Sequence, residues 1–525
     1  GGELNIGDIQ TGSLTSNKTI RVTKKLNADG EGTVRIDTSA GFINAVPATE
    51  SELETLPLME QDDGLQKTSM MLVNAKGAEI IGSGGGLSLV DQNGKVLSNA
   101  LTSKVIQNGV HVANAGYDWK LTTSGSEEEA SGLYLNYGLT QVELLGQGDS
   151  ALILYATPGL PENSLANDLS AKVVGSGDLK ISAVGETVSL SNPENTYTGG
   201  TFVMSDSTLK LGADSALGAT KEVNLAERAI LNLNDHSQEI GKLTVATDAQ
   251  VDMADSSQLT VKEGGTVSAG GLKGSGNLIV QRGTLEISGA NADFHASTSI
   301  KPDAAVEINS VLGLGDNEVQ DNGTLTLKNI EKPSDGGNPL HYETYLTYDE
   351  FANTLIGSGK LNAENSSFAL TGKNSDFNGT IEVGADSDIA VFKNNALGEA
   401  KIENNGKLDL LFDEEYSYID NFLSGNGTTV VHGYATVSNN SVQNNSYTGD
   451  WLVLGKLSSD KGAHTSQELW GSGKTELNWG NIEIFVSDDG FTYDNSLTGH
   501  GALWIYSDPN SKGINQEFKF DNNLK

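Results

Sequence analysis

Ser150 is the first residue whose surroundings suggest catalysis, because "GQGDSAL" (146–152) approaches the Gly-Asp-Ser-Gly turn of serine proteases. Such an enzyme needs a histidine that takes the proton from the serine hydroxyl and an aspartate that orients the histidine. Ala151 stands where the second glycine of the turn is expected. His111, the only histidine upstream, alternates in "NGVHVANAG" like an ordinary strand residue. The sequence therefore does not favour a protease.

Paired carboxylates are the second candidate for chemistry, since glycan hydrolases place two of them on either side of the scissile bond. Such groups stand at Asp62–Asp63, at 413–415 and at Asp488–Asp489. An acidic chain produces such pairs without any catalytic purpose, and its four arginines are few for a lyase, which pairs carboxylates with a basic residue. We expect no enzymatic activity and keep a glycan-cleaving enzyme as a remote alternative.

Metal and cofactor binding are also not favoured. The chain has no cysteine, which excludes thiolate metal sites and thiol nucleophiles. Calcium would need regularly spaced carboxylate and carbonyl oxygens. "GSGGGLSLVDQNG" (82–94) is only a partial version of a calcium-binding glycine-aspartate array, and no EF-hand loop is present. We expect no metal and no cofactor.

The charge of the chain disfavours several partners. With 69 acidic and 33 basic residues the net charge is −36, whereas nucleic acids and anionic lipids attract basic surfaces. The one basic cluster, "NKTIRVTKK" (17–25), fits a solvated strand face. No apolar run approaches the ~20 residues that span a bilayer, so we expect no membrane insertion by this fragment. We interpret the chain as a processed or trimmed piece of a larger protein.

Any functional residue must be positioned by short strands, because helical periodicity is nearly absent. Pairs of apolar residues separated by one polar residue recur along the chain, as a strand with one buried face requires. Gly, Asn, Asp and Ser separate these pairs, as expected of turns. The sequence therefore predicts an all-β fold. The pairs are Leu179/Ile181, Leu209/Leu211, Leu243/Val245, Leu259/Val261, Leu285/Ile287, Val306/Ile308, Leu325/Leu327, Ile381/Val383 and Leu408/Leu410.

A second repeated unit selects among all-β folds. A Gly-x-Gly turn leads into a strand at Gly175, Gly274, Gly357, Gly425, Gly471 and Gly499. An Asn-rich step and an aromatic residue follow four of these turns, at Tyr197, Phe294, Phe377 and Tyr447. A spacing near 20 residues suits one coil of a β-solenoid, with asparagines hydrogen-bonding between coils at the corners. A sandwich or propeller would want regular hairpins or a constant blade period. We predict a solenoid of roughly 22 residues per coil.

Two segments interrupt the pattern and are predicted to extrude from corners. Val46–Gly64 carries six carboxylates and no basic residue, among them Asp62 and Asp63. In Lys332–Leu355, Tyr342, Tyr345, Tyr348 and Phe351 stand at intervals of three, which would align them on a short helix. Those aromatic residues either pad the solenoid or form a ligand-binding knob. The candidate binding residues are Asp62, Asp63, Tyr342, Tyr345 and Tyr348.

Four of the five tryptophans stand in the last 75 residues: Trp451, Trp470, Trp479 and Trp504. Tryptophan at a strand position of a β-helix usually fills the core, although an exposed ring could stack on a sugar. We expect these residues in the core.

The repeats at 175–218 and 357–398 resemble the autotransporter-associated β-strand repeat of Gram-negative passenger domains, particularly of self-associating adhesins. The shared pattern is Gly-x-Gly, a strand, an Asn-rich step with Tyr or Phe, Thr/Asn-Gly, a strand and an Ala-Leu-Gly close. The copies at Gly274 and Gly425 are degenerate, and those at Gly471 and Gly499 keep only the opening turn. "SGLYLNYGLTQVELLGQGDSALILYA" (131–156) also resembles passenger sequence upstream of such repeats.

The resemblance covers about residues 131–505, and the first 130 residues agree in character only. It implies a right-handed parallel β-helix with three-stranded coils and corner extrusions, exported to the cell surface by a C-terminal barrel absent from this chain. We divide the chain into N-terminal coils (1–170, with extrusion 46–64) and repeat-bearing coils (171–525, with extrusion 332–355) of one continuous solenoid.

Adhesion is the function that the resemblance implies, by self-association between cells or by binding to a host matrix protein through the extrusions. Two copies at −36 repel each other, so pairing requires a less acidic face, matching of basic with acidic strips, or screening by salt. A matrix partner would be basic or collagen-like.

Overall fold

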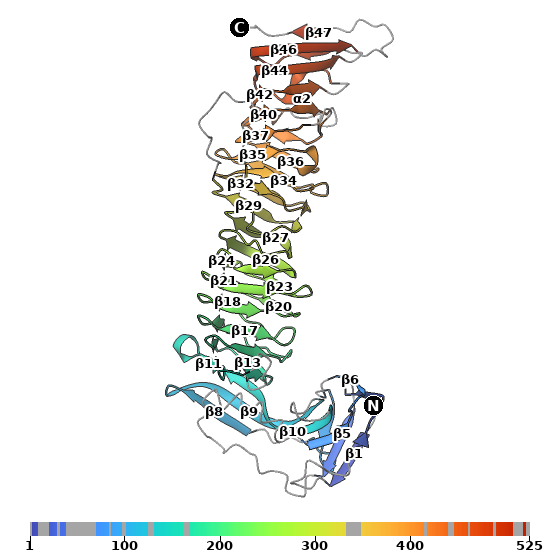
Figure 1. The fold of residues 1–525 in the computed structure, drawn as a ribbon, viewed down its shortest axis with the longest axis vertical. Helices are drawn as coiled ribbons and strands as arrows, with labels where there is room; N and C mark the ends of the chain where they lie inside the picture. Colours follow the sequence, from blue (N-terminus) through green and yellow to red (C-terminus); the bar gives the residue numbers. More distant parts are fainter. Residues whose placement is uncertain are drawn as a thin grey trace. The chain divides into compact units, whose positions relative to one another are not determined.

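The structure is a computed structural model and describes residues 3–8, 20–28, 32–37, 70–82, 84, 86–96, 101–123, 131–160, 167–331, 348–413, 417–438, 446–459, 463–486, 490–507 and 518–520. In this part of the chain nearly every element is a β-strand (Figure 1). The chain forms a β-solenoid of stacked parallel coils, as predicted. It divides into two compact units, residues 1–241 with 249–251 and residues 242–248 with 252–525, which we describe separately.

The first unit begins with short strands that pair in parallel across long stretches of sequence. β1 (Glu3–Asp8) pairs with β4 (Thr33–Asp37), which pairs with β7 (Ser88–Val90). β2 (Ile20–Arg21) pairs with β5 (Met70–Asn74), and β3 (Lys25–Asn27) with β6 (Glu79–Ile81). The basic residues Arg21 and Lys25 lie in these strands.

An antiparallel meander then replaces the coils predicted for this region. β8 (Leu101–Gln107), β9 (Val110–Thr122) and β10 (Gly132–Leu144) pair antiparallel. Asn108 and Gly109, between β8 and β9, have φ values of 50° and 75°. Positive φ at both central residues is the geometry of a tight hairpin turn, for which Asn-Gly is the preferred sequence. The prediction of β-helix coils is therefore wrong between Leu101 and Leu144, and the Asn-Gly signal was missed.

Parallel coils begin after this meander. In one sheet β11 (Leu152–Tyr155), β14 (Leu179–Ser182), β16 (Thr201–Val203) and β18 (Glu222–Leu225) pair in order. In a second sheet β12 (Asp168–Leu169), β15 (Thr187–Leu190), β17 (Thr208–Leu211) and β19 (Ile230–Asn232) do the same. The coils are offset by close to the predicted number of residues, since Leu179 pairs with Thr201 and Thr201 with Val223.

The second unit continues the parallel stacking in two main sheets. One contains β24 (Gly265–Val267), β26 (Asn277–Ile287), β27 (Ser297–Ile308), β29 (Thr324–Lys328), β32 (Lys360–Glu364), β34 (Thr380–Val383) and β36 (Lys401–Asn404). The other contains β30 (Glu350–Phe351), β33 (Ser367–Leu370), β35 (Asp388–Val391), β37 (Lys407–Leu410), β40 (Thr428–Val431), β42 (Asp450–Val453) and β44 (Thr475–Val486). β46 (Leu497–Ser507) pairs with β44, and the short helix α2 (Ser466–Trp470) has a capping box.

The core consists of the alternating apolar residues that the sequence singled out. Every residue of the nine predicted pairs is buried, and so are the four repeat aromatics. Parallel register stacks equivalent residues of successive coils, as in the inward column Phe368, Ile389 and Leu408. The hydrophobic effect thus stabilises each coil only together with its neighbours.

The Gly-x-Gly turn and the Asn-aromatic step are stacked on one another. Gly357 forms a parallel bridge with Phe377 of the next coil. Its φ is +102°, and a Cβ there would lie 2.4 Å from the carbonyl oxygen of Asp321, so only glycine fits. Asn374 accepts from the backbone N–H of Leu355 and donates to the carbonyl of Ala396, both at 2.7 Å. The repeat therefore joins three successive coils.

Candidate functional site

Tyr348 is the one candidate binding residue that the structure describes. Its ring is buried against Ala369 of β33 and Ala390 of β35, on the face of the sheet that points away from the solenoid core. Its hydroxyl lies 3.2 Å from Asp388 Oδ2 and 2.7 Å from Asp409 Oδ2. The small alanine side chains leave room for the ring, so Tyr348 fastens the end of segment 332–355 to this sheet.

Two aspartates, a lysine and a histidine complete a charged cluster around the Tyr348 hydroxyl. Lys407 Nζ lies 2.5 Å from Asp409 Oδ2 and 3.3 Å from Asp388 Oδ2. His432 Nε2 lies 3.3 Å from Asp409 Oδ1. Register produces the cluster, because Asp388 pairs with Lys407 on the adjacent strands β35 and β37.

Burial by itself raises the pKa of Asp409. Hydrogen bonds from His432, Lys407 and Tyr348 together with the lysine charge outweigh burial and lower this pKa from 3.8 to about 2. A depressed carboxyl pKa stabilises the folded state above the unfolded value. This contribution is therefore complete above about pH 4 and disappears as the pH falls through about 2. Burial lowers the pKa of Lys407, but the two aspartates outweigh it and raise that pKa.

Replacing Tyr348 with Phe should loosen this part of the sheet while the ring still packs. The change removes a hydroxyl donor shared by two buried carboxylates, at a cost of about 1–2 kcal/mol. We expect backbone amides of β35 and β37 to exchange roughly tenfold faster in hydrogen-exchange mass spectrometry. Tyr418→Phe, at an exposed tyrosine of β38 (Tyr418–Ile419), is the matched control. Equal exchange in both variants would contradict a fastening role for the hydroxyl.

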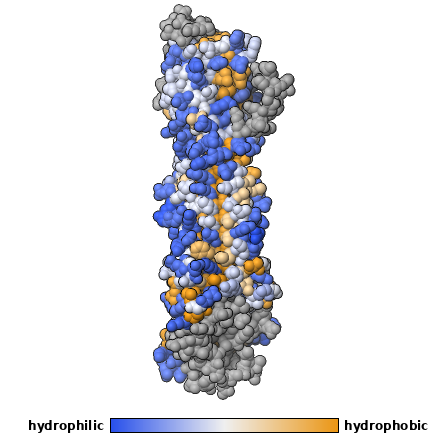
Figure 2. Space-filling view, turned by 90° about the vertical axis from the view of Figure 1, so that its left-hand side faces the viewer, coloured by the Kyte–Doolittle hydropathy of each residue, from blue (hydrophilic) through white to orange (hydrophobic). Residues whose placement is uncertain are grey.

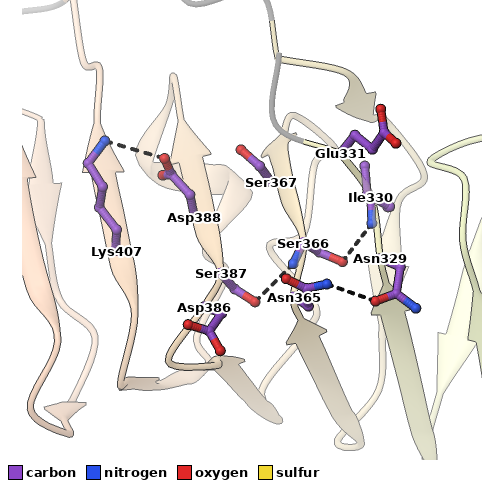
Figure 3. A pocket seen from close by; sticks show the side chains of 10 residues that line it. All are labelled: Asn329, Ile330, Glu331, Asn365, Ser366, Ser367, Asp386, Ser387, Asp388 and Lys407. Carbon is purple, nitrogen blue, oxygen red and sulfur yellow. Dashed lines mark hydrogen bonds and ion pairs between the residues drawn. The ribbon is translucent and has the colours of Figure 1, made fainter. Parts of the chain in front are cut away.

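A polar groove of about 670 Å³ lies next to this cluster (Figure 3). It is lined by Asn329, Ile330, Glu331, Asn365, Ser366, Ser367, Asp386, Ser387, Asp388 and Lys407. These residues come from three loops that precede or follow stacked strands, and from the first residues of β33, β35 and β37. Parallel stacking places such loops side by side, which makes the groove a consequence of the register.

Much of the groove wall is held by hydrogen bonds between coils (Figure 3). Ser366 Oγ lies 3.1 Å from the N–H of Ile330, and Ser387 Oγ lies 3.2 Å from the N–H of Ser366. Asn365 Nδ2 donates to Asn329 Oδ1 at 2.9 Å. These bonds fix the shape of the groove without a ligand.

The remaining candidate binding residues, Asp62, Asp63, Tyr342 and Tyr345, lie outside the described residues, as does the whole acidic extrusion 46–64. The predicted helix is wrong at its described end, because Phe351 lies in β30 and is buried against Phe368 at 6.4 Å between ring centroids. Tertiary packing on the neighbouring strand prevails over the three-residue spacing of the aromatics.

The residues considered for catalysis are placed as follows. Ser150 ends the 3₁₀ turn η1 (Gly148–Ser150), and the His111 ring lies 2.8 Å from Asn114 Oδ1. Asp413 is exposed, whereas Asp488 and Asp489 lie outside the described residues.

Within the described ranges, no group of three or more histidine, aspartate or glutamate side chains could hold a metal ion. Nor is any helix there long and apolar enough to cross a membrane.

The outer surface of the first main sheet carries two parallel rows of charged and polar side chains, which we call the β26–β36 face. Register aligns one row of acids, Glu286, Glu307, Glu382 and Glu403, interrupted by Thr326 and Asn362. The adjacent row contains Thr324, Lys360, Thr380 and Lys401 in the same order. Lys328 lies 3.6 Å from Glu307 and 3.5 Å from Glu364, and Lys360 pairs with Glu382.

The tryptophans divide between core and surface, so their prediction as core residues is half right. Trp451 and Trp470 are buried. Trp479 is 74% exposed and stacks on His500, with 6.2 Å between ring centroids, and Trp504 is 52% exposed. Trp479 lies at a bend of β44 with a φ of +63°, and Trp504 points outward opposite Glu483. The neighbours of the two exposed tryptophans share no pattern that would have identified them, since Trp479 stands between Asn478 and Gly480 and Trp504 between Leu503 and Ile505.

Comparison with known proteins gives two relatives from Escherichia coli K12. The chain is 39% identical to "Uncharacterized protein YuaQ" over 327 residues, which are 62% of this chain and 23% of that protein. It is 35% identical to "Uncharacterized lipoprotein YdeK" over 435 residues, 82% of this chain and 30% of that protein. The chain therefore spans less than a third of each relative. No protein-family model matches it, and no solved structure does.

Proposed function

We propose that this chain is the contact-forming part of a bacterial surface adhesin of the autotransporter-passenger kind, and that it self-associates through the β26–β36 face. The observation that carries the proposal is that parallel register stacks a glutamate row beside a lysine-bearing row on one sheet. A repeated face offers many weak contacts at once, and their sum is strong but reversible.

The composition of this face answers part of the objection from net charge. Its two rows have four glutamates and two lysines, and the adjoining in-register pair Lys328 and Glu364 brings the total to five glutamates and three lysines. The whole chain has 69 acidic residues against 33 basic ones, so the face is less acidic than average. In a twofold pair whose axis follows the coil stack, the lysine row of one copy faces the glutamate row of the other.

The surface also favours polar contacts. On the face drawn in Figure 2, hydrophilic side chains predominate, and apolar ones gather in narrow strips and small patches. Permanent interfaces are usually more apolar than this, whereas a polar face suits reversible contact between cells.

A surface location fits the proposal. One relative is named a lipoprotein, and the repeats resemble those of exported passengers. Export through a C-terminal barrel absent from this chain belongs to the same proposal.

Analytical ultracentrifugation tests self-association directly. We expect the purified chain to associate with rising concentration, and more strongly at about 0.15 M salt than at low salt, because screening weakens the long-range repulsion more than close pairing. Lys360→Glu with Lys401→Glu should weaken association about tenfold or more. Lys273→Glu with Lys393→Glu makes the same charge change at exposed residues outside this sheet, in β25 (Leu272–Gly274) and just before the 3₁₀ turn η3 (Asn394–Ala396), and should weaken association much less.

A mixing experiment identifies the face itself. Glu382→Lys with Glu403→Lys should also impair association, and mixing this variant with the Lys360/Lys401 variant should restore it by exchanging the charges across the interface. A chain that stays monomeric at every concentration and salt would overturn self-association of this fragment. Equal effects of the face and control variants would overturn the assignment of the face.

A further inference from the structure

The groove beside Tyr348 has the dimensions and the lining of a recognition site rather than of a packing gap. Its volume of about 670 Å³ lies within the range of small-molecule and side-chain pockets. Nine of its ten lining residues are polar, and Ile330 is the exception. An apolar ligand would cover these polar groups without hydrogen-bonding to them, which costs free energy. The groove therefore suits a ligand that forms hydrogen bonds.

One buried hydroxyl in the groove has no partner among the described residues. Ser367 is only 4% exposed, and its Oγ forms no hydrogen bond there. The neighbouring hydroxyls of Ser366 and Ser387 are both satisfied by contacts between coils. A buried hydroxyl without a hydrogen bond usually lowers the stability of the folded state. A ligand atom in the groove that hydrogen-bonds to Ser367 would remove this cost.

The charge of the lining favours a cation. Glu331, Asp386 and Asp388 contribute carboxylates, and Lys407 is the single basic residue of the lining. The Lys407 ammonium already lies within ion-pairing distance of Asp388 and Asp409. Glu331 and Asp386 are exposed at the groove, where they can meet an incoming positive group.

We propose that this groove binds the basic side chain of a protein partner, with arginine favoured over lysine. A guanidinium is a planar fork of several donors, so it suits a lining rich in carboxylate, hydroxyl and amide oxygens. Asp386 offers a carboxylate and Ser367 a hydroxyl at different points along the groove, on adjacent coils. The inference is independent of self-association, because one monomer contains the complete groove.

Isothermal titration of the full chain at about 0.15 M salt tests the inference with a blocked tripeptide, acetyl-Gly-Arg-Gly-amide. The matched ligand carries citrulline, which has nearly the shape of arginine but no charge. We expect saturable one-to-one binding of the arginine peptide and at least about tenfold weaker binding of the citrulline peptide.

Three variants locate the binding. Asp386→Asn and Ser367→Ala should each raise the Kd about fivefold. Asp376→Asn, at an exposed aspartate of the same unit outside the groove lining, changes the net charge equally and should alter the Kd by less than about twofold. Because Ser367 is buried, its replacement could disturb folding. The Kd of Ser367→Ala is therefore interpreted only if the variant has the same unfolding midpoint as the native chain. If the midpoint differs, Asp386→Asn alone decides the test.

The inference is overturned by any of three results. Equal binding of the citrulline peptide would show that charge is not recognised. Equal weakening by Asp376→Asn would show diffuse attraction to an acidic chain. Absence of saturable binding would show that the groove takes no basic side chain.

Discussion

Replacing Asn374 with Ala should lower the free energy of unfolding of the second unit by about 4 kcal/mol. The buried side chain accepts from the N–H of Leu355 and donates to the carbonyl of Ala396, both at 2.7 Å. Alanine would leave both backbone groups buried without a partner, and each such group costs about 1–3 kcal/mol. Since these groups belong to the coils on either side, the effect should extend to both neighbours.

Denaturant unfolding followed by tryptophan fluorescence measures this change, because four of the five tryptophans belong to the second unit. Hydrogen exchange of peptides containing Leu355 and Ala396 gives the local effect. Asn378→Ala is the matched control at an exposed asparagine of the same corner, and should change stability by less than about 0.5 kcal/mol. Comparable losses in the two variants would refute the bridging role of Asn374.

Replacing Asp321 with Asn should stabilise the protein above neutral pH by about 4 kcal/mol. Asp321 is fully buried, and burial raises its pKa from 3.8 to about 7 despite hydrogen bonds from nearby backbone N–H groups. A carboxyl whose folded pKa is raised destabilises the folded state wherever the unfolded chain is ionised. The penalty is therefore absent below about pH 4, grows between pH 4 and 7, and is complete above pH 7.

Denaturant midpoints measured from pH 4 to pH 8 test this dependence. The advantage of Asp321→Asn over the native chain should be small near pH 4 and increase until about pH 7. Asp303→Asn, at an exposed aspartate of β27, should show little such increase and serves as the control. A gain from Asp321→Asn that is the same at every pH would mean that charge burial is not its cause.

The sequence alone determined the solenoid, because its signals are local and repeated. Alternation such as Leu325/Leu327 specifies a strand with one buried face, and the structure buries both residues. The Gly-x-Gly signal marked Gly357 as a turn residue. In the structure its φ is +102° and a backbone atom lies close by, so the position requires glycine. The Asn-Gly hairpin at 108–109 was equally readable, but the stronger expectation of parallel coils obscured it.

The candidate site could be predicted only in part, because it depends on which coils lie next to each other. Tyr348 was singled out, but its contact with Asp409 joins residues 61 positions apart. Segment 332–347 intervenes between Glu331 and Tyr348, so the spacing of residues gives no register across it. The same lack of register concealed the polar groove and the paired rows of the β26–β36 face.

Exposure of individual side chains was likewise decided by the tertiary structure. Trp451 and Trp504 both stand in strands, yet the first points into the core and the second outward. A shift of one residue in strand register would exchange such faces. Composition and periodicity thus determined that this protein is an acidic stack of short strands. Which side chains meet on its surface was determined only by the pairing of one coil with the next.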